Sequence, residues 1–380
     1  MIRTLLALWV LLVPLQAFAL TSVVVTGDTA TFDASQADKL VLRSNGGAVM
    51  LDTLPGTSPG VLANGTLIDI FNDDALALLE VRSGSGATLD GMASNFLLLG
   101  PKQSARLWSD GLGYRTLQKP YKVKAGMSQH FYIDPLNGID TNSGIDPSRP
   151  VKKPQAAYDY VNHHFDLNSR GATFKLADGV YTDQLIASFT LTGWNTTGIP
   201  LVVLSGNLAN PGAVIMRPPT GVHAILASSS TYLYVEGIRF EGAINAVFWS
   251  FVTIWDSVQF GPIANGTAHM IVDSLSYINA PKAYELVGGG TLLAHIWASD
   301  KGHVLVNASD IYVRESFTFN AGFSHVNTFG HLAWYATIHF DEGATITGAK
   351  TFVYTNGLVQ GGNKMPGSGQ YVAEQGQLLP

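Results

Sequence analysis

A long series of short apolar segments after residue 172 is the feature that most constrains this fold. Many of these segments are apolar throughout, as is typical of parallel strands with both faces covered. Two of them, TYLYVEGIRFEG (231–242) and FVTIWDSVQFG (251–261), share a pattern at a spacing of about 20 residues, which predicts a solenoid with about eight turns in residues 172–360. AHMIVDSLSYIN (268–279) and SDIYVRESFTFNAG (309–322) echo that pattern. A large antiparallel sandwich is the alternative.

One amphipathic helix is predicted just before this series. Phe131–Asp134 has the pattern of a short strand, and the Gly and Pro residues of the loop that follows exclude regular structure. Pro154 occupies a favourable first helical position. A solenoid end exposes a hydrophobic cross-section and unpaired strand edges, so we expect a helix over Pro154–Leu167 to cover it. Its apolar face would consist of Ala157, Tyr160, Val161, His164 and Phe165.

This order of strand, Asn-Gly-x-Asp loop, Pro-rich turn and helix resembles the N-terminal cap of right-handed parallel β-helix proteins of the pectate lyase-like group. The resemblance implies a right-handed parallel β-helix whose end is plugged by the helix. The segment GGNKMPGSGQY (361–371) resembles C-terminal tails of phage-type β-helix proteins. Residues 361–380 are therefore expected to form an extended tail that packs on a neighbouring subunit.

Residues 20–118 alternate apolar and polar side chains in short runs, with turn signals such as Asn64–Gly65 and Asp90–Gly91 between them. This pattern predicts an antiparallel sandwich or small barrel that ends in a hairpin turning at Asp110–Gly113. The order of its motifs resembles the small β domains at the N-terminal ends of phage tail fibres and tailspikes; a generic sandwich is the alternative. Residues 119–128 are predicted to be a linker.

The N-terminal segment 1–19 has the features of a secretory signal peptide: Arg3, an apolar core over Leu5–Leu15, and Ala17-Phe18-Ala19 as a cleavage site. The predicted organisation is thus all-β. It comprises a signal peptide (1–19), an attachment-like β domain (20–118), a linker (119–128), the entry strand, loop and capping helix (129–171), the β-helix (172–360) and a tail (361–380).

Composition narrows the class of partner. Charged residues make up 13% of the chain, the formal charge is −6 and there is no cysteine. A negative chain argues against nucleic acid or an anionic membrane as partner, since both attract basic surfaces. A neutral, hydroxyl-bearing polysaccharide remains compatible, and neither a cofactor nor a metal is predicted.

The acidic position of the repeat supplies the predicted catalytic residues, Glu236, Asp256 and Asp273. If the repeats align, these carboxylates stand on successive turns about one strand spacing apart. Neighbouring carboxylates raise one another's pKa, so one of them would serve as a general acid, and glycoside hydrolysis requires such a pair. The alternative is that each acid caps a turn between two strands.

A polar and aromatic group supplies the predicted substrate-binding residues, with aromatic faces for sugar rings and charged neighbours for hydroxyl groups. It consists of Arg239, Glu241, Trp249, Trp255 and Tyr277. The alternative is that the aromatic rings fill the solenoid interior.

Two further sets of residues are expected to be structural. The loop acids Asp134, Asp140 and Asp146 are expected to form Asx turns, with a Ca²⁺ site as the alternative. The late histidines are expected to be structural rather than metal ligands or bases; they are His295, His303, His325, His331 and His339.

Three functions remain open at this stage. The first is a tailspike-like homotrimer, virion-associated, that recognises bacterial surface polysaccharide and cleaves it if active. The second is a secreted polysaccharide lyase or glycoside hydrolase, and the third is a secreted adhesin without catalytic activity. The signal peptide favours the last two. Few arginines follow Arg217, so a hydrolase is favoured over a lyase.

Overall fold

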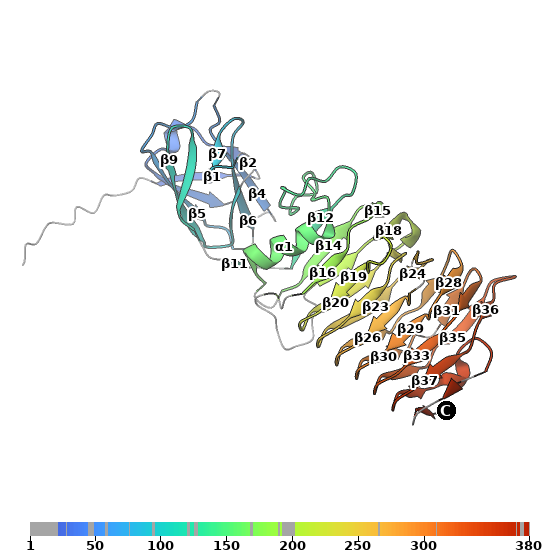
Figure 1. Cartoon of the computed structure of the whole chain (residues 1–380). Coiled ribbons are helices and arrows are strands. Elements are labelled where there is room, and N and C mark those ends of the chain that lie inside the picture. Colours follow the sequence, from blue (N-terminus) through green and yellow to red (C-terminus); the bar gives the residue numbers. More distant parts are fainter. Residues whose placement is uncertain are drawn as a thin grey trace, which may run out of the picture.

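The computed structural model describes residues 22–27, 29–44, 49–57, 60–75, 77–92, 96–119, 122–124, 128–167, 170–188, 191, 202–264, 267–308, 310–369, 371–372 and 376–379. The predicted signal peptide lies outside the described residues. The described part is all-β, with one α-helix, and has two regions: a small β domain and a long stack of parallel strands (Figure 1).

Two sheets make up the N-terminal domain. The six-stranded sheet has the order β1 (Ser22–Thr26), β3 (Leu40–Ser44), β5 (Leu67–Asn72), β9 (Ser104–Ser109), β10 (Gly113–Gln118) and β7 (Thr88–Leu89). The four-stranded sheet has the order β2 (Thr29–Thr31), β4 (Val49–Leu54), β6 (Leu78–Ser83) and β8 (Phe96–Leu99). Apolar side chains fill the space between the two sheets.

The prediction of an antiparallel sandwich is wrong in strand direction for most of this domain. β1, β3 and β5 pair in parallel, and so do β2, β4 and β6, because the chain crosses from one sheet to the other after each strand. Alternation of side chains reports which face is buried and carries no information on strand direction. The predicted hairpin is confirmed, since β9 and β10 pair antiparallel across residues 110–112.

A buried ion pair lies between these sheets. The Arg43 guanidinium donates to both carboxylate oxygens of Asp52, at 2.9 and 2.7 Å, and both side chains are fully buried. Arg43 also donates to the carbonyl oxygens of Val25 and Gly27. Burial raises the pKa of Asp52 even though Arg43 acts in the opposite direction. Such a pair is stable only while both partners are present.

The predicted linker is not a free connection. It contains β11 (Val123–Lys124), which pairs in parallel with β13 (Phe165–Asp166) immediately after the helix. The Lys122 Nζ atom donates to the carbonyl oxygen of Asn162 at 2.7 Å. These contacts hold the connection against the capping segment.

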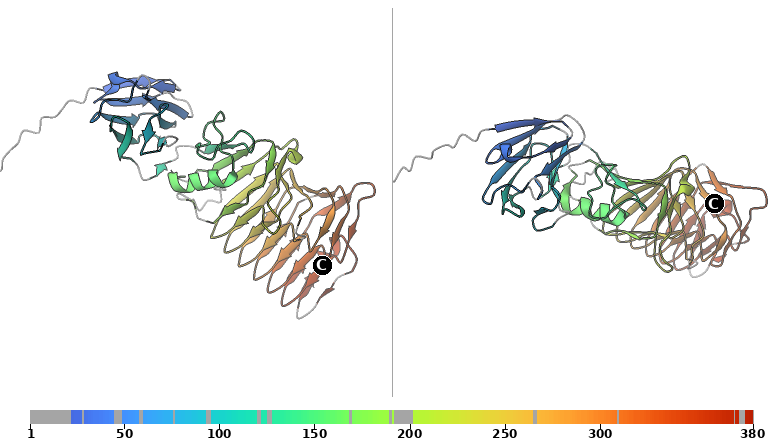
Figure 2. Two further views of the ribbon diagram at one scale, coloured as in Figure 1. Left: turned by 45° about the horizontal axis from the view of Figure 1, so that its top comes forward. Right: turned by 90° about the horizontal axis from the view of Figure 1, so that it is seen from above.

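The capping helix is confirmed as α1 (Pro154–His164), which starts at Pro154 as expected and ends before the predicted end at Leu167. It packs on β12 (Gln129–Ile133), β14 (Ala172–Leu176) and β16 (Leu185–Ala187), the first strands of the stack. Both views in Figure 2 show it at the end that faces the N-terminal domain. Tyr158, absent from the predicted apolar face, is fully buried.

The N-terminal domain is joined directly to this cap. The buried Glu80 carboxylate of β6 accepts a hydrogen bond from Ser143 Oγ at 2.6 Å and lies 3.2 Å from the Arg149 guanidinium, both in the loop before the helix. The rings of Phe96 and Tyr160 contact each other, with centroids 5.4 Å apart. The two regions therefore share an interface as well as a chain connection.

Three parallel sheets form the stack, which is a parallel β-helix. The ten-stranded sheet contains β12, β14, β17 (Val202–Ser205), β20 (Tyr232–Glu236), β23 (Phe251–Asp256), β26 (Tyr277–Ala280), β30 (His303–Val306), β34 (His331–Trp334), β38 (Leu358–Gln360) and β40 (Gln377–Leu379).

The second sheet has seven strands, β15 (Gly179–Tyr181), β18 (Val214–Met216), β21 (Arg239–Phe240), β24 (Val258–Phe260), β27 (Tyr284–Leu286), β31 (Asp310–Val313) and β35 (Thr337–Phe340). The third has eight strands, β16, β19 (Ile225–Ala227), β22 (Ile244–Ala246), β25 (Met270–Val272), β29 (Ile296–Ala298), β33 (Ser324–Val326), β37 (Thr351–Val353) and β39 (Tyr371–Val372). A short sheet of β28 (Gly290–Leu292), β32 (Phe317–Phe319) and β36 (Ile346–Thr347) widens the later turns.

The turns of the β-helix are unequal in length, and in the ten-stranded sheet the expected repeat holds only between β20 and β23 and again between β38 and β40. Leu233 pairs with Val252, close to the expected spacing, whereas Val252 pairs with Ile278 and Ile278 with Val304, both clearly farther along the chain. Long corner loops and the extra strand lengthen these other turns. The ten-stranded sheet still places eight of its described strands, β14 to β38, within residues 172–360, which agrees with the expected number of turns.

The C-terminal tail differs from the prediction. β39 and β40 fall in residues 361–380 and extend two of the parallel sheets, pairing with β37 and β38. This part of the tail continues the coil of its own chain. Figure 1 shows it at the end of the β-helix remote from the N-terminal domain.

Candidate functional site

Strand register brings two of the three predicted catalytic carboxylates together. Tyr232 on β20 lies opposite Phe251 on β23, and after a one-residue shift Glu236 lies opposite Asp256. The residue that creates the shift is Trp255, which has no partner in this ladder. The predicted pairing of Glu236 with Asp256 is therefore observed, while their catalytic roles stay predictions.

This β-bulge sets the direction of the Trp255 side chain, as bulges do near functional sites. Trp255 is 39% exposed and stacks on Tyr234, with ring centroids 5.6 Å apart and an interplanar angle of 22°. The Lys282 ammonium lies 5.7 Å from the centroid of the Trp255 ring. Trp255 thus lies on the outside of the β-helix and is not a core residue.

Asp273 does not join the other two acids. It follows β25 in the eight-stranded sheet, at a different corner of the β-helix. The expected column of three carboxylates is wrong because the turn that contains Asp273 is longer than the assumed repeat, so the similar segment at 268–279 is out of register. Ser274 Oγ donates to the Asp273 carboxylate at 3.0 Å, as expected of an acid that stabilises a turn.

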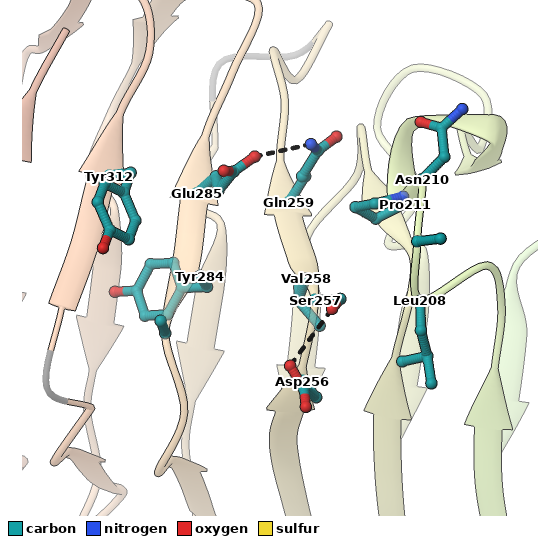
Figure 3. A pocket seen from close by; sticks show the side chains of 12 residues that line it. Leu208, Asn210, Pro211, Asp256, Ser257, Val258, Gln259, Tyr284, Glu285 and Tyr312 are labelled. Atoms are coloured by element: carbon teal, nitrogen blue, oxygen red, sulfur yellow. Dashed lines mark hydrogen bonds between the residues drawn. The ribbon is translucent and has the colours of Figure 1, made fainter.

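Asp256 instead opens onto a groove of about 420 Å³ at the corner between the ten-stranded and seven-stranded sheets (Figure 3). Ser257 Oγ donates to Asp256 at 3.3 Å, and Gln259 Nε2 donates to Glu285 at 2.8 Å. Around them lie Leu208, Ala209, Asn210, Pro211, Val258, Ala283, Tyr284 and Tyr312. We call this cavity the acidic groove.

The groove is held in place from the neighbouring turn. Arg314 donates to Glu285 at 2.5 and 3.1 Å and to Asp341 at 3.0 Å, and its guanidinium lies 4.8 Å from the centroid of the Tyr312 ring. Tyr312 in turn stacks on His339, with centroids 5.1 Å apart. Carboxylates, amides, a hydroxyl and a ring face thus surround one cavity, which is the set of groups that binds sugar hydroxyls and pyranose faces.

Sequence reasoning missed Gln259, Glu285 and Tyr312, although they share an outward position on β24, β27 and β31. In each strand they lie between two buried apolar residues, in VQF, YEL and IYV. That three-residue pattern could have predicted the outward column from the sequence. It aligns the three strands only if the turns of the β-helix are allowed to differ in length.

A column of aromatic side chains covers the outer face of the ten-stranded sheet. Tyr232, Phe251 and Tyr277 lie opposite one another on successive strands. Tyr232 and Phe251 stack with centroids 4.5 Å apart at 12°, and Phe251 and Tyr277 are 6.0 Å apart. His303 and His331 continue the column, with their Nδ1 atoms 3.2 Å apart. The predicted ligand residue Tyr277 therefore lies in a continuous aromatic row.

The corner beside this column, where the chain passes from β22 to β23, carries exposed apolar side chains in a backbone conformation that is unfavourable for bulky residues. Phe248 and Trp249 both have positive φ, 51° and 65°, and are 60% and 59% exposed. Bulky residues rarely adopt this region, and where they do it is mostly in turns. The same two-residue turn recurs in the described chain at Ser229–Ser230, Ser274–Leu275, Asp300–Lys301, Thr328–Phe329 and Thr355–Asn356.

Arg239 and Glu241 are separated from the aromatic candidates. They lie on and beside β21 in the seven-stranded sheet, where the buried Glu241 carboxylate pairs with both Arg217 and Arg239, the latter at 3.0 Å. The predicted binding group thus divides into Trp249, Trp255 and Tyr277 around one face and an ion-pair cluster on another. The ion pairs account for both charged residues structurally.

The late histidines do not form one cluster, and His295 lies inside the β-helix. His269 Nε2 faces the carbonyl oxygen of Gly261 at 2.9 Å, so it carries the proton and Nδ1 accepts. His295 Nδ1 then donates to that atom at 2.8 Å, and Tyr284 donates to His295 Nε2 at 2.8 Å. Burial lowers the pKa of His269 to about 4 and holds that of His295 well below its usual range. This neutral chain is fully hydrogen-bonded in a single proton arrangement.

Two of the three loop acids form the predicted Asx turns: Asp134 accepts from the backbone N–H groups of Leu136 and Asn137, and Asp146 accepts from that of Ser148. Asp140 instead accepts from the backbone N–H groups of Lys152 and Lys153, across the loop. In the part of the chain that the structure describes, no three His, Cys, Asp or Glu side chains are grouped as metal ligands. Within that same part, no helix has the length and apolar character needed to span a bilayer.

Comparisons with protein-family models, with curated proteins and with solved structures find no match to this chain. Two features of the described surface are candidates for a binding site: the acidic groove and the aromatic column that leads to it.

Proposed function

We propose that this protein binds bacterial surface polysaccharide across the outer face of the ten-stranded sheet and into the acidic groove. The observation that carries the proposal is that β20, β23 and β26 together present aromatic rings, from Tyr232 to Trp255, and that β23 ends at the groove carboxylate Asp256. Aromatic faces pack on sugar rings, and carboxylates and amides hold their hydroxyl groups. The parallel stack holds these groups rigidly, so little ordering entropy is lost on binding.

The setting we propose is that of a tailspike-like homotrimer, secreted or virion-associated. The exposed apolar corner, with Phe248, Trp249 and Phe329, is consistent with association because monomers rarely expose such rows. A signal peptide at residues 1–19 favours export. A monomer in light scattering would count against the tailspike-like assembly and favour the adhesin.

Depolymerase activity is the second candidate. Asp256 and Glu285 line the same groove, and glycoside hydrolysis uses two carboxylates on either side of the scissile bond. A lyase needs a basic residue as proton abstractor, and the lining residues include no Lys or Arg among those described. A hydrolase is therefore the enzyme class we propose if the protein cleaves its ligand. Release of reducing ends without unsaturated products would identify it.

The binding proposal is tested by replacing the bulged tryptophan. Extracted capsular polysaccharides and lipopolysaccharides would be immobilised, and binding of the chain would be measured by interferometry. We expect Trp255→Ala to weaken binding about tenfold, the loss typical of a central aromatic contact. Phe340→Ala, which alters a 46% exposed ring on another sheet, serves as the matched control.

Equal binding by the parent chain and Trp255→Ala would show that this face is not the binding surface. If no polysaccharide binds at all, the proposal fails as a whole. Binding without any release of reducing ends would leave the adhesin and exclude the hydrolase for the polymers tested.

A further inference from the structure

We infer that the acidic groove takes an uncharged sugar unit and rejects a uronic acid unit, an inference that rests on the proposed polysaccharide binding. It concerns the charge of the ligand. The aromatic side chains cannot distinguish charged from uncharged sugars, because a ring face packs on any pyranose, so the polar groups of the acidic groove must do so.

The lining of the groove is acidic. Asp256 is an exposed carboxylate that accepts a hydrogen bond from a neutral hydroxyl group, Ser257 Oγ at 3.3 Å. Glu285 lies on β27 of the seven-stranded sheet and accepts a hydrogen bond from the side-chain amide of Gln259. Asn210 and Tyr312 contribute an amide and a ring with a hydroxyl group. These groups offer hydrogen-bond donors and acceptors to sugar hydroxyls. The two carboxylates, however, repel a carboxylate on the sugar.

Two cations lie near the groove, and neither is among its lining residues. Arg314 is bonded to both Glu285 and Asp341 and lies over the Tyr312 ring. Lys282 keeps its charge and lies over the Trp255 ring. A uronate that recruited Arg314 would have to displace a carboxylate from it. The displaced carboxylate and the bound uronate would then face each other in one cavity.

The other arginines of the seven-stranded sheet lie outside the groove lining. Arg217 and Arg239 share the buried Glu241 carboxylate, which compensates one of their two positive charges, and neither residue lines the groove. An uncharged chain can follow this surface without electrostatic cost. A polyuronate is repelled at Asp256, and the described lining residues include no cation to offset that repulsion.

The test compares each polysaccharide with its own carboxyl-reduced form. Uronate-containing capsular polysaccharides would be reduced with carbodiimide and borohydride, which converts each uronic acid to the neutral sugar and leaves the linkages unchanged. We expect the reduced forms to bind the full chain about fivefold or more tightly than their parents, the effect of removing one like-charge contact at a surface. Added salt should narrow the difference, since it screens exposed charges.

Two variants locate the effect. Asp256→Asn should narrow the difference in affinity between each unreduced uronate polymer and its reduced form about fivefold, whatever its effect on the reduced form itself. Glu342→Gln removes an exposed acid outside the groove lining and should leave that difference unchanged. Unreduced polymers that bind as tightly as the reduced ones, or more tightly, would overturn the inference and leave the proposed function standing. If no polymer binds in either form, both fall.

Discussion

The N-terminal domain and the β-helix both bury polar side chains, but the kind of buried polar group differs between them. Both contain parallel strands that pass from sheet to sheet, although the N-terminal domain also has antiparallel pairs. The first buries a charged pair, Arg43 and Asp52, between its sheets. The second buries a neutral chain of His269, His295 and Tyr284. A charged pair stabilises its domain only while both partners are present, and a neutral chain of hydrogen bonds only while its histidines stay unprotonated. We therefore expect a single substitution in the pair to destabilise the first region and acid to destabilise the second.

Their turns differ as well. In the N-terminal domain the non-Gly residues at positive φ are Asp38, Asp90 and Lys102 among those described. The first two are of a type that tolerates this region. At the corner of the β-helix the same region holds Phe248, Trp249 and Phe329. The same turn recurs in the coil with small or polar residues such as Ser229–Ser230 and Thr355–Asn356, so the conformation belongs to the fold and only the side chains differ between turns.

The largest effect is expected from breaking the charged pair. Arg43→Met leaves the Asp52 carboxylate buried without its partner, and we expect the N-terminal domain to lose about 3–5 kcal/mol of unfolding free energy. Urea unfolding, followed by the fluorescence of Trp108 in a background lacking the other tryptophans, measures it. The double variant Arg43→Met/Asp52→Leu should recover most of the loss. A single variant within about 1 kcal/mol of the parent would show that the pair is dispensable.

Acid should weaken the β-helix and spare the N-terminal pair. The pKa of His269 falls from 6.5 to about 4 on folding, so the unfolded chain binds more protons between these values. The free energy of unfolding should therefore fall as the pH drops from about 6.5 to about 4, by on the order of 3 kcal/mol for this residue. Thermal unfolding at stepped pH measures the slope.

The sign is opposite for Asp52, because burial raises its pKa and stability is lost as pH rises through the folded value. The matched control is His269→Leu/His295→Leu/Tyr284→Phe, which removes the chain without leaving an unpaired hydroxyl. It should be less stable at neutral pH and show a flatter pH dependence. An unchanged slope in this variant would assign the acid sensitivity to other groups.

The smallest effect on stability concerns the strained corner. Trp249→Gly relieves a left-handed backbone conformation that costs a bulky residue about 1–2 kcal/mol, offset in part by the entropy of glycine. We expect the melting temperature to stay equal or rise slightly while association of the chain, measured by light scattering, weakens. Ser230→Gly, at the same turn position in an earlier turn, is the control that should leave association unchanged. A fall in both stability and association would mark Trp249 as structural.

Several elements are predictable because their signal is local. Pro154 and the spacing of Ala157, Tyr160 and Val161 predict the capping helix, which the structure confirms. The Asp110–Gly113 turn predicts the hairpin between β9 and β10 for the same reason. The pairing of Glu236 with Asp256 is also predictable, because the turn that joins them is close to the assumed repeat.

The position of Asp273 and the residues of the acidic groove could not be predicted, because the corner loops differ in length from one turn to the next. A fixed repeat places Asp273 wrongly and misses Glu285 and Tyr312, because corner loops of unequal length change which residues share a column.

Local sequence information was sufficient to establish that the chain is all-β, that one helix caps a stack of short apolar strands, and where that helix begins. These properties follow from side-chain periodicity and turn chemistry, which act over a few residues. Strand direction, register and the make-up of the groove emerge only in the folded chain. They arise from hydrogen bonds between residues a full coil apart in the sequence, such as Leu204 with Val235, and no local pattern encodes those pairings.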